Sequence, residues 1–350
     1  MAHFDAEDER FGHQLPEPFR NVVHHNDSWR ESLFFIMHMR NEPGDVLILT
    51  LAHFPAHNEI DSLQLGRVGN SPVMARHART TAADPNNWNV GPVSIDIVEP
   101  KKKIHLLARK SDATPVELDI TFTARTSPYQ LRRGTMKAGN EVVWDQTHMF
   151  QSGTYNGTYV HNGKTYEVDN WWGQRDHSWG VRVHNRCPMW MWTPIQLEEG
   201  FLQVWHWEYP NGARVYTDGC FAPVGGGEPI PVIAFEHDLQ WQDANGNDVS
   251  YGQFGEEVVG LAGVLSFTLE GGRKIVVEGS GRWAQRYSGI ALKTPNVLGG
   301  GLSEMQVTTS DGQRGSAIYE LTGQWHHRYF PIGRGEKLPP LGVTPGELHS

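Results

Sequence analysis

The clearest pattern in the sequence is a period-two alternation of apolar and polar residues. In residues 116–124 every second side chain is apolar, and acidic residues and threonines occupy the positions between them. In an extended chain this period places the apolar side chains on one face and the polar ones on the other. Residues 116–124 are therefore predicted to form a β-strand with one buried face.

Further strands are predicted where short apolar runs end at turn signals. Asn162-Gly163 and Asn211-Gly212 each lie between two apolar runs, and Asn-Gly supplies the positive φ angles of a tight hairpin turn. No helix of any length is predicted. The other predicted strands are residues 29–39, 46–53, 155–160, 201–209, 232–241, 264–269, 274–278, 305–309 and 317–321.

Composition supports a β-rich fold with two parts. The chain has 350 residues with 38 glycines, 21 prolines and 13 tryptophans, and only 20% of its residues are charged. Strands recurring at this spacing must close on themselves or pack in pairs, because long exposed edges invite aggregation. We predict an all-β protein of two β-barrels packed together. The expected parts are a barrel with an irregular N-terminal arm in residues 1–148, a second barrel in residues 149–335, and a surface tail in residues 336–350.

Charge and apolar content exclude several classes of partner. The net charge of −10 leaves no concentrated basic surface for nucleic acid. No stretch approaches the roughly 18 apolar residues of a membrane-spanning helix, and the acidic start of the chain lacks the layout of a secretion signal. We expect a cytoplasmic protein with no nucleic-acid partner and no membrane span. The sequence leaves open whether the chain forms a homodimer.

No metal or cofactor site is predicted. The 18 histidines include no His-Glu-x-x-His motif, and in strands the side chains of the adjacent pair His326-His327 would point apart. Cys187 and Cys220 are far apart and lack metal-type spacing, so ordinary buried thiols are expected. The chain also lacks a nucleophile elbow, a phosphate loop and a glycine fingerprint for nicotinamide or flavin.

Tryptophan is concentrated in one stretch. Seven of the 13 tryptophans fall between residues 171 and 207, where acids and histidines are interleaved with them. An indole buries a large area but carries an N–H group that needs a partner, which favours the wall of a cavity. The alternative is simple filling of a large barrel. The residues predicted to bind substrate are Trp172, Trp179, Trp192, Trp205, Trp207, His206 and Glu208.

Two candidate catalytic residues lie side by side in this stretch. In an extended chain Arg175, His177 and Trp179 share one face, whereas Asp176 and Ser178 share the other. His177 could therefore line a cavity together with Trp179. Asp176 would more readily hold a backbone or a neighbouring strand. A purely structural role for His177 is the alternative.

The next hairpin supplies a second candidate pair. With a two- or four-residue loop, Tyr216 pairs with Trp207 and Asp218 pairs with Trp205; with a three-residue loop, His206 faces Tyr216 instead. In both registers Tyr216 and Asp218 share a face. A carboxylate walled by apolar rings has a raised pKa and can donate a proton near neutral pH. The alternative is a surface aspartate at a strand end.

A family resemblance rests on residues 172–180, which read Trp-Gly-Gln-Arg-Asp-His-Ser-Trp-Gly. This segment resembles the Asp-His-x-Trp-Gly segment of the carotenoid 1,2-hydratase (hydroxyneurosporene synthase) and AttH-like superfamily. The resemblance covers residues 153–221, and residues 29–35 are similar to the opening strand of the first barrel. It implies a double-calycin fold, that is, two tandem lipocalin-like barrels, with the Asp-His-x-Trp-Gly segment in the second barrel.

The resemblance also implies site residues and chemistry. In the carotenoid hydratases the acid/base work is assigned to a His-x-Trp pair and a Tyr-x-Asp pair, which match His177-Ser178-Trp179 and Tyr216-Thr217-Asp218. We therefore expect a cofactor-independent lyase acting on a hydrophobic aromatic or isoprenoid molecule by hydration, dehydration or loss of a small fragment such as formaldehyde. Asp218 would transfer the proton with His177 as its partner.

Two alternatives to the lyase use the same pocket. One is a non-catalytic carrier of hydrophobic ligands, and the other is a cofactor-free isomerase or cyclase. A carrier would have its buried acids tied up in ion pairs, so the pairing of the buried carboxylates separates it from an enzyme.

Overall fold

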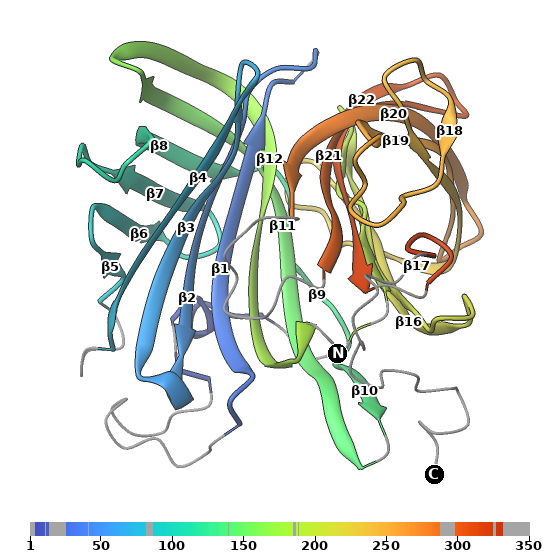
Figure 1. The fold of residues 1–350 in the computed structure, drawn as a ribbon, viewed down its shortest axis with the longest axis horizontal. Helices are drawn as coiled ribbons and strands as arrows, with labels where there is room; N and C mark the ends of the chain where they lie inside the picture. The colour runs from blue at the N-terminus through green and yellow to red at the C-terminus, as the bar shows by residue number, and fades with distance from the viewer. Residues whose placement is uncertain are drawn as a thin grey trace.

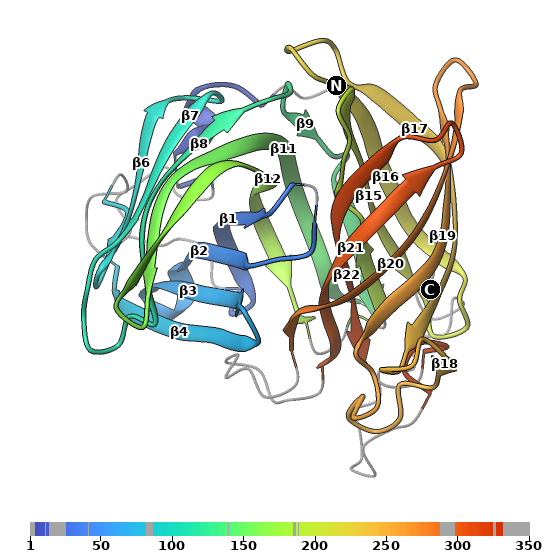
Figure 2. The same cartoon turned by 90° about the horizontal axis from the view of Figure 1, so that it is seen from above.

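The computed structural model describes residues 4–10, 12–13, 26–40, 42–81, 87–138, 140–184, 187, 189–287, 298–324 and 327–331. These residues form two antiparallel sheets that each curl and lie side by side (Figure 1, Figure 2). The described residues include short 3-10 turns at Glu7–Glu9 and Pro55–His57. Neither is long or apolar enough to cross a bilayer. The all-β prediction is confirmed.

The first sheet has 12 strands and is made by the N-terminal half of the chain. Its main path runs β4-β3-β2-β1-β12-β11-β8-β7-β6-β5, so that the hairpin of β11 and β12 sits in the middle of the sheet, next to β1. The strands are β1 (Trp29–His38), β2 (Val46–Phe54), β3 (Glu59–Val68), β4 (Ser71–Thr80), β5 (Asn89–Val90), β6 (Val93–Glu99), β7 (Lys103–Ala108), β8 (Val116–Ala124), β9 (Tyr129–Gln130), β10 (Gly134–Ala138), β11 (Glu141–His161) and β12 (Lys164–Arg182).

The second sheet has 10 strands and closes through pairing of β15 with β16. The neighbouring seam between β16 and β17 is thin, because only two residue pairs join these strands. The strands are β13 (Met189–Trp192), β14 (Ile195–Gln196), β15 (Gly200–Glu208), β16 (Arg214–Pro223), β17 (Ile230–Gln242), β18 (Asp248–Val249), β19 (Gly260–Leu269), β20 (Lys274–Arg286), β21 (Leu298–Thr309) and β22 (Arg314–Gln324).

Alternate side chains of β1 enter two different cores. Leu33 and Phe35 point into the first barrel, where they pack with buried side chains such as Phe122. Phe34 and Ile36 point the other way and join a cluster between the two sheets, to which β13 and β15 contribute tryptophans. A third cluster fills the second barrel. The period of two therefore decides which side chains face the barrel and which face the junction.

The predicted strands and the first Asn-Gly turn are confirmed. Each predicted strand lies within or overlaps an observed one, and Asn162 and Gly163 have φ angles of 50° and 75° in the turn between β11 and β12. At the second Asn-Gly turn only Gly212 has a positive φ angle, of 79°. Strands β3, β4, β6 and β7 escaped prediction. The expected tail, residues 336–350, lies outside the described residues.

Strand pairing corrects the placement of the Asp-His-x-Trp-Gly segment. This segment lies on β12, which pairs with β1 and β11 and so belongs to the first sheet. The expected boundary between residues 148 and 149 falls inside β11, and the second sheet begins at Met189. Residues Glu141–His161 form one continuous 21-residue strand, so the expected boundary divides a single element. The division into two folding domains stays a prediction.

Gly180, in the Trp-Gly end of this segment, is required by a close strand approach. Its φ angle is 134°, and a Cβ atom there would lie 2.1 Å from the carbonyl oxygen of Asp145. We expect Gly180→Ala to lower the free energy of unfolding by about 3 kcal/mol, through backbone strain and this clash. Gly163→Ala is the matched control, since nothing lies within 4 Å of its added Cβ; it should cost about 1 kcal/mol. Denaturant unfolding measures both, and equal losses would contradict the interpretation.

Candidate functional site

A cavity of about 510 Å³ lies between the two sheets. Its lining combines β1, β2, β3, β11 and β12 of the first sheet with β13, β15 and β22 of the second. This volume falls in the range that holds a small organic ligand. The cavity is therefore the candidate site, and it exists only where both sheets meet.

Aromatic rings form much of its wall. Trp192 packs edge-on against Phe34 and Trp205, with ring centroids 5.9 and 6.4 Å apart, and Trp190 lies 5.4 Å from Trp144. The indole N–H groups of Trp144, Trp192 and Trp205 are buried and have no hydrogen-bond partner among the described residues. Such donors are costly to leave unpaired, so the wall offers both ring faces and hydrogen bonds to a ligand.

One acidic group in the cavity is held protonated near neutral pH. Glu320 on β22 accepts hydrogen bonds at Oε1 from the indole N–H of Trp190, at 2.9 Å, and from the hydroxyl of Tyr287, at 3.0 Å. Burial raises the pKa of Glu320 to about 7. No ion pair holds this carboxyl group within the described part of the chain. Glu320 can therefore donate a proton to a bound molecule at neutral pH.

A histidine in the same cavity is held neutral. Burial lowers the pKa of His148 to about 4, although the carboxylate of Asp176 lies 3.5 Å from its Nε2 atom and opposes the shift. Its Nδ1 atom has no hydrogen-bond partner among the described residues. Since Asp176 accepts at Nε2, the Nδ1 atom carries the lone pair, which makes His148 a candidate general base.

A chain of hydrogen bonds fixes Asp176. Arg182 donates to the hydroxyl of Ser178 at 2.7 Å, and this hydroxyl donates to Asp176 Oδ1 at 3.3 Å. These three side chains lie on the cavity face of β12, because the strand alternates as the sequence predicts. Glu320, which can donate a proton, and His148, which can accept one, thus face one cavity. Acid/base catalysis needs such a pair of groups.

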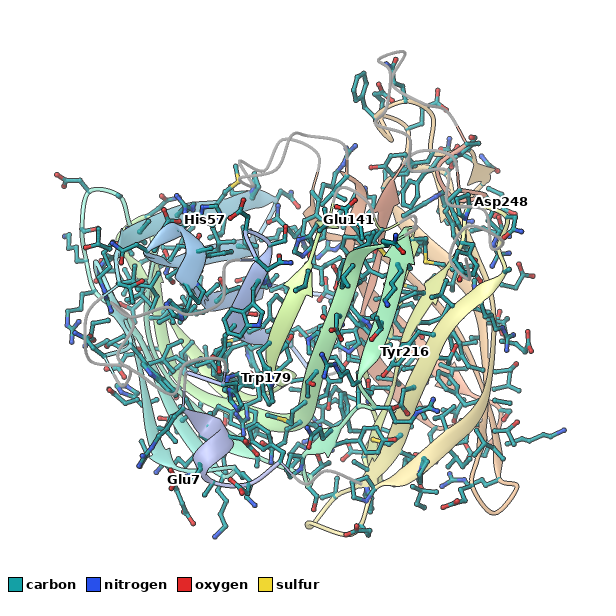
Figure 3. All side chains as sticks on the ribbon, turned by 90° about the horizontal axis from the view of Figure 1, so that it is seen from below. Glu7, His57, Glu141, Trp179, Tyr216 and Asp248 are labelled. Atoms are coloured by element: carbon teal, nitrogen blue, oxygen red, sulfur yellow. The ribbon has the colours of Figure 1, made fainter. Side chains whose placement is uncertain are left out.

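Three of the predicted site residues line the cavity and eight do not. Asp176, Trp192 and Trp205 line it. The other predicted residues lie outside the lining of the cavity and are spread over both sheets. For example, Trp179 lies on β12 of the first sheet and Tyr216 on β16 of the second (Figure 3). The eight are Asp218, His177, Tyr216, Trp179, Trp207, Trp172, His206 and Glu208.

Asp218 joins the two sheets together. The strand register pairs it with Trp205, and pairs Tyr216 with Trp207, as one of the two predicted registers has it. Asp218 accepts hydrogen bonds from the backbone N–H of Arg132 at 2.7 Å and from the hydroxyl of Tyr129 at 3.1 Å. Both donors belong to the segment around β9 of the first sheet. Among the described residues Asp218 therefore serves the junction between the sheets and not the cavity.

His177 lies on the barrel face of β12, opposite the cavity. Its Nε2 atom is 3.0 Å from Glu31 Oε1, and Trp179 stacks on His13 with ring centroids 3.5 Å apart. On the same face Arg175 donates two hydrogen bonds, of 2.8 and 2.6 Å, to the carboxylate of Glu9. These contacts anchor the N-terminal segment, so the predicted shared cavity of His177 and Trp179 is not found.

The remaining predicted residues have other neighbours. Trp172 lies between the guanidinium groups of Arg40 and Arg125, at 4.6 and 4.5 Å from its ring. Trp207 stacks on Tyr216 in the packing between the sheets. His206 and Glu208 lie together in the second barrel and contact each other there.

The sequence missed His148, Glu320 and the tryptophans at positions 144 and 190. Position 320 did carry a signal, because a carboxylate interrupts the apolar run of residues 317–321. A charged side chain in a buried strand is rare unless it is paired or functional. His148 carried no comparable signal, since its partners come from other strands.

Comparison with known proteins supports the fold. The model of a family described as "Family of unknown function (DUF8625)" matches residues 6–277. No curated protein sequence matches the chain.

Three solved structures share the architecture. An AttH protein from Nitrosomonas europaea is 13% identical, with 86% of this chain and 94% of that chain covered and a TM-score of 0.59. CghA with Sch210972 is 9% identical, with 85% and 89% covered and a TM-score of 0.52. Kievitone hydratase from Nectria haematococca is 12% identical, with 89% and 92% covered and a TM-score of 0.50. The predicted double-calycin fold is thereby confirmed.

We expect Asp218→Ala to destabilise the protein by about 2 kcal/mol, because it leaves the Tyr129 hydroxyl and the Arg132 N–H without their acceptor. Denaturant unfolding measures the loss. The matched control is Asp238→Ala on the exposed side of β17, which should change stability by less than about 0.5 kcal/mol. If Asp218→Ala is as silent as the control, Asp218 does not hold the junction.

Proposed function

We propose that this chain, which belongs to the family of unknown function DUF8625, is a cofactor-independent lyase that works in the cavity between the sheets. The substrate is a hydrophobic aromatic or isoprenoid molecule, and the reaction is a hydration, a dehydration or the loss of a small fragment. A cytoplasmic location and a homodimer remain predictions.

The observation that carries the proposal is the buried carboxyl group of Glu320, which forms no ion pair among the described residues and faces an aromatic cavity that also holds His148. The guanidinium groups of Arg30 and Arg182 line the same cavity and act on Glu320 only at longer range. A carrier has no need of such a group, since desolvating a carboxyl costs stability unless it is paired. Other buried acids are paired: Glu9 with Arg175, for example, and Glu304 with Arg67. A carrier would have its buried carboxylates tied up in ion pairs, and Glu320 forms none among the described residues, so the enzyme is favoured.

The proposed step is a proton-coupled elimination or its reverse. In dehydration, Glu320 gives its proton to the leaving hydroxyl oxygen, the C–O bond breaks and water departs. His148 removes a proton from the adjacent carbon, whose bonding pair forms the new double bond. Asp176 stabilises the resulting imidazolium, and exchange with solvent restores both groups. In hydration the same groups act in reverse order.

The aromatic walls stabilise the positive charge that develops on the substrate. Positive charge on the reacting carbon is stabilised by the faces of nearby indole rings, which carry negative potential. The rings of Trp192 and Trp205 also stack against a planar or polyene ligand. Among the proteins of shared fold, kievitone hydratase is a hydratase by name, which agrees with this class of reaction.

The reaction class can be read from the fate of bound ligands. Tryptophan fluorescence identifies binders among aromatic and isoprenoid compounds, and mass spectrometry then examines each binder after incubation in deuterated buffer. Gain or loss of water, loss of formaldehyde, or a product with new deuterium supports acid/base chemistry. A product of unchanged mass but altered retention indicates the isomerase or cyclase. Recovery of every tight binder unchanged would leave the carrier.

Glu320→Gln is expected to reduce turnover of the substrate so found by at least 100-fold and to change its affinity by less than threefold, because the amide keeps the shape of the side chain but cannot donate the catalytic proton. Wild-type activity should fall as pH rises through about 7, where Glu320 loses its proton. Glu278→Gln, on the exposed side of β20, is the matched control and should keep wild-type rates. Full activity of Glu320→Gln would remove Glu320 from the mechanism.

The raised pKa of Glu320 also predicts a pH dependence of stability. Below pH 4.5 the carboxyl is protonated in both the folded and the unfolded chain. Between about pH 4.5 and 7 the unfolded chain releases the proton while the folded chain retains it, so stability falls as pH rises through this window. We expect a loss on the order of 2 kcal/mol in the wild type that is absent in Glu320→Gln. Urea unfolding at pH 5 and pH 8 measures the difference, and parallel curves would contradict it.

A further inference from the structure

A second cluster of ionisable side chains lies inside the second barrel, apart from the cavity. It consists of His206 and Glu208 on β15 and His237 on β17, whose Nε2 and carboxylate oxygen atoms all lie within 4.8 Å of one another. The Nε2 atoms of His206 and His237 are 3.2 and 2.8 Å from Glu208 Oε1. The three side chains have exposures of 0%, 4% and 4%, so they are desolvated together.

Each of the two histidine rings is oriented by a hydroxyl group next to its Nδ1 atom. His206 Nδ1 lies 2.7 Å from the hydroxyl of Thr217, and His237 Nδ1 lies 2.9 Å from the hydroxyl of Tyr329. Where each hydroxyl oxygen accepts a hydrogen bond from Nδ1–H, the lone pair of each Nε2 is directed at the carboxylate and can ligate a cation placed between them. In the other tautomer Nε2–H donates to Glu208, so binding of an ion selects the first tautomer. This outer support of ligating histidines is typical of metal sites.

We propose that His206, Glu208 and His237 bind one divalent transition-metal ion of the zinc class. Two imidazoles and one carboxylate are a ligand set that zinc accepts, with a further position open to water. Metal–ligand bonds of about 2.0–2.2 Å place neighbouring ligand atoms of a tetrahedral shell about 3.3 Å apart. The observed 3.2 and 2.8 Å separations need outward shifts of only a few tenths of an ångström to admit the ion.

Two neighbours complete the site without ligating the ion. The backbone N–H of Tyr329 donates to His327 Nδ1 at 3.3 Å, which leaves His327 Nε2–H to donate to Glu208 Oε2 at 3.0 Å. His327 therefore orients the carboxylate. Arg328 Nε lies 3.6 Å from the same oxygen, and its Nη2 atom lies 3.0 and 3.1 Å from the two ring nitrogens of His237. This guanidinium must therefore turn toward solvent when an ion enters, and its side chain is already 48% exposed.

The position of the site gives the ion a structural role. Strands β16 and β17 share only the pairs Cys220↔Pro231 and Phe221↔Ile230, so the barrel is weakly closed along this seam. An ion held by β15 and β17, with Thr217 of β16 behind it, bridges the seam. Ion binding should therefore stabilise the second barrel by linkage.

The group His13, Glu31 and His177 has a similar composition but a different function. Both oxygens of Glu31 are already engaged, since Oε2 accepts the backbone N–H groups of Gly12 and His13 and Oε1 contacts both imidazoles. These bonds anchor the N-terminal segment. Glu31 is thus held by two backbone N–H groups, which the described residues do not supply to Glu208, and the group serves as the competing site in the test.

Cobalt(II) binding tests the proposal on the full-length protein after removal of metals with a chelator. We expect one equivalent of Co²⁺ to bind and to produce visible absorption of a four- or five-coordinate ion. Zn²⁺ should compete for the site and, at about 100-fold above its Kd, raise the thermal unfolding midpoint by about 5–10 °C. His237→Gln should weaken Co²⁺ binding at least 100-fold, whereas the control His105→Gln, on the exposed side of β7, should bind as the wild type does.

Separate measurements show whether the variants are folded and which of the two clusters binds the ion. Circular dichroism reports whether His237→Gln is folded; if it is not, Thr217→Val keeps all three ligands and should weaken Co²⁺ binding about 10-fold. Absence of a stoichiometric Co²⁺ spectrum in the wild type overturns the proposal. So does a spectrum that survives His237→Gln and Thr217→Val but disappears in His177→Gln. None of these readouts involves turnover, so they are independent of the proposed lyase.

Discussion

Burial of β12 on both faces is the constraint on which the rest of the structure depends. The strand lies between β1 and β11, and its alternation sends Arg175, His177 and Trp179 into the first barrel and Asp176 into the cavity. Charged side chains on two buried faces need partners on both sides. The N-terminal segment supplies them on one face, and the second sheet covers the other. A one-residue slip of this strand would exchange the two sets and leave both unpaired.

The polar groups between the sheets divide into two kinds. Asp218 and Glu304 connect the sheets through partners on the opposite sheet, Arg132 and Arg67, and these links fix the width of the junction. Glu320 is buried without such an ion pair among the described residues, and its pKa is raised to about 7. Rigid connections around an unpaired acid are what preorganisation requires, because the acid can be held in place only if the surrounding contacts are satisfied.

Local patterns in the sequence predicted local structure well. The alternation in residues 116–124 and the turn at Asn162-Gly163 follow from a few neighbouring residues and strand geometry. The pairing of Trp205 with Asp218 is one of the two registers that the sequence left open. The period of two also predicted correctly that Asp176 and His177 lie on opposite faces.

The candidate site could not be predicted in the same way. Which face of β12 borders the cavity depends on sheet packing, because both faces are buried and both carry charge. Asp218 was expected in the pocket since it lies beneath tryptophans, but the backbone of Arg132, from a segment 86 residues away, occupies that space. Glu320 and His148 come from different sheets, and only the tertiary fold makes them neighbours of one cavity.

The origin of the cavity walls has a consequence for biosynthesis. The strands of the first sheet are complete once Arg182 has been made, whereas Glu320 lies on β22, the last strand among the described residues. Contacts this distant in sequence form slowly, and domains synthesised first tend to fold first. On the ribosome the nascent chain therefore carries an open aromatic surface with no acid opposite it. The pocket gains Glu320, and its protection from solvent, only when the strands of the second sheet close over it.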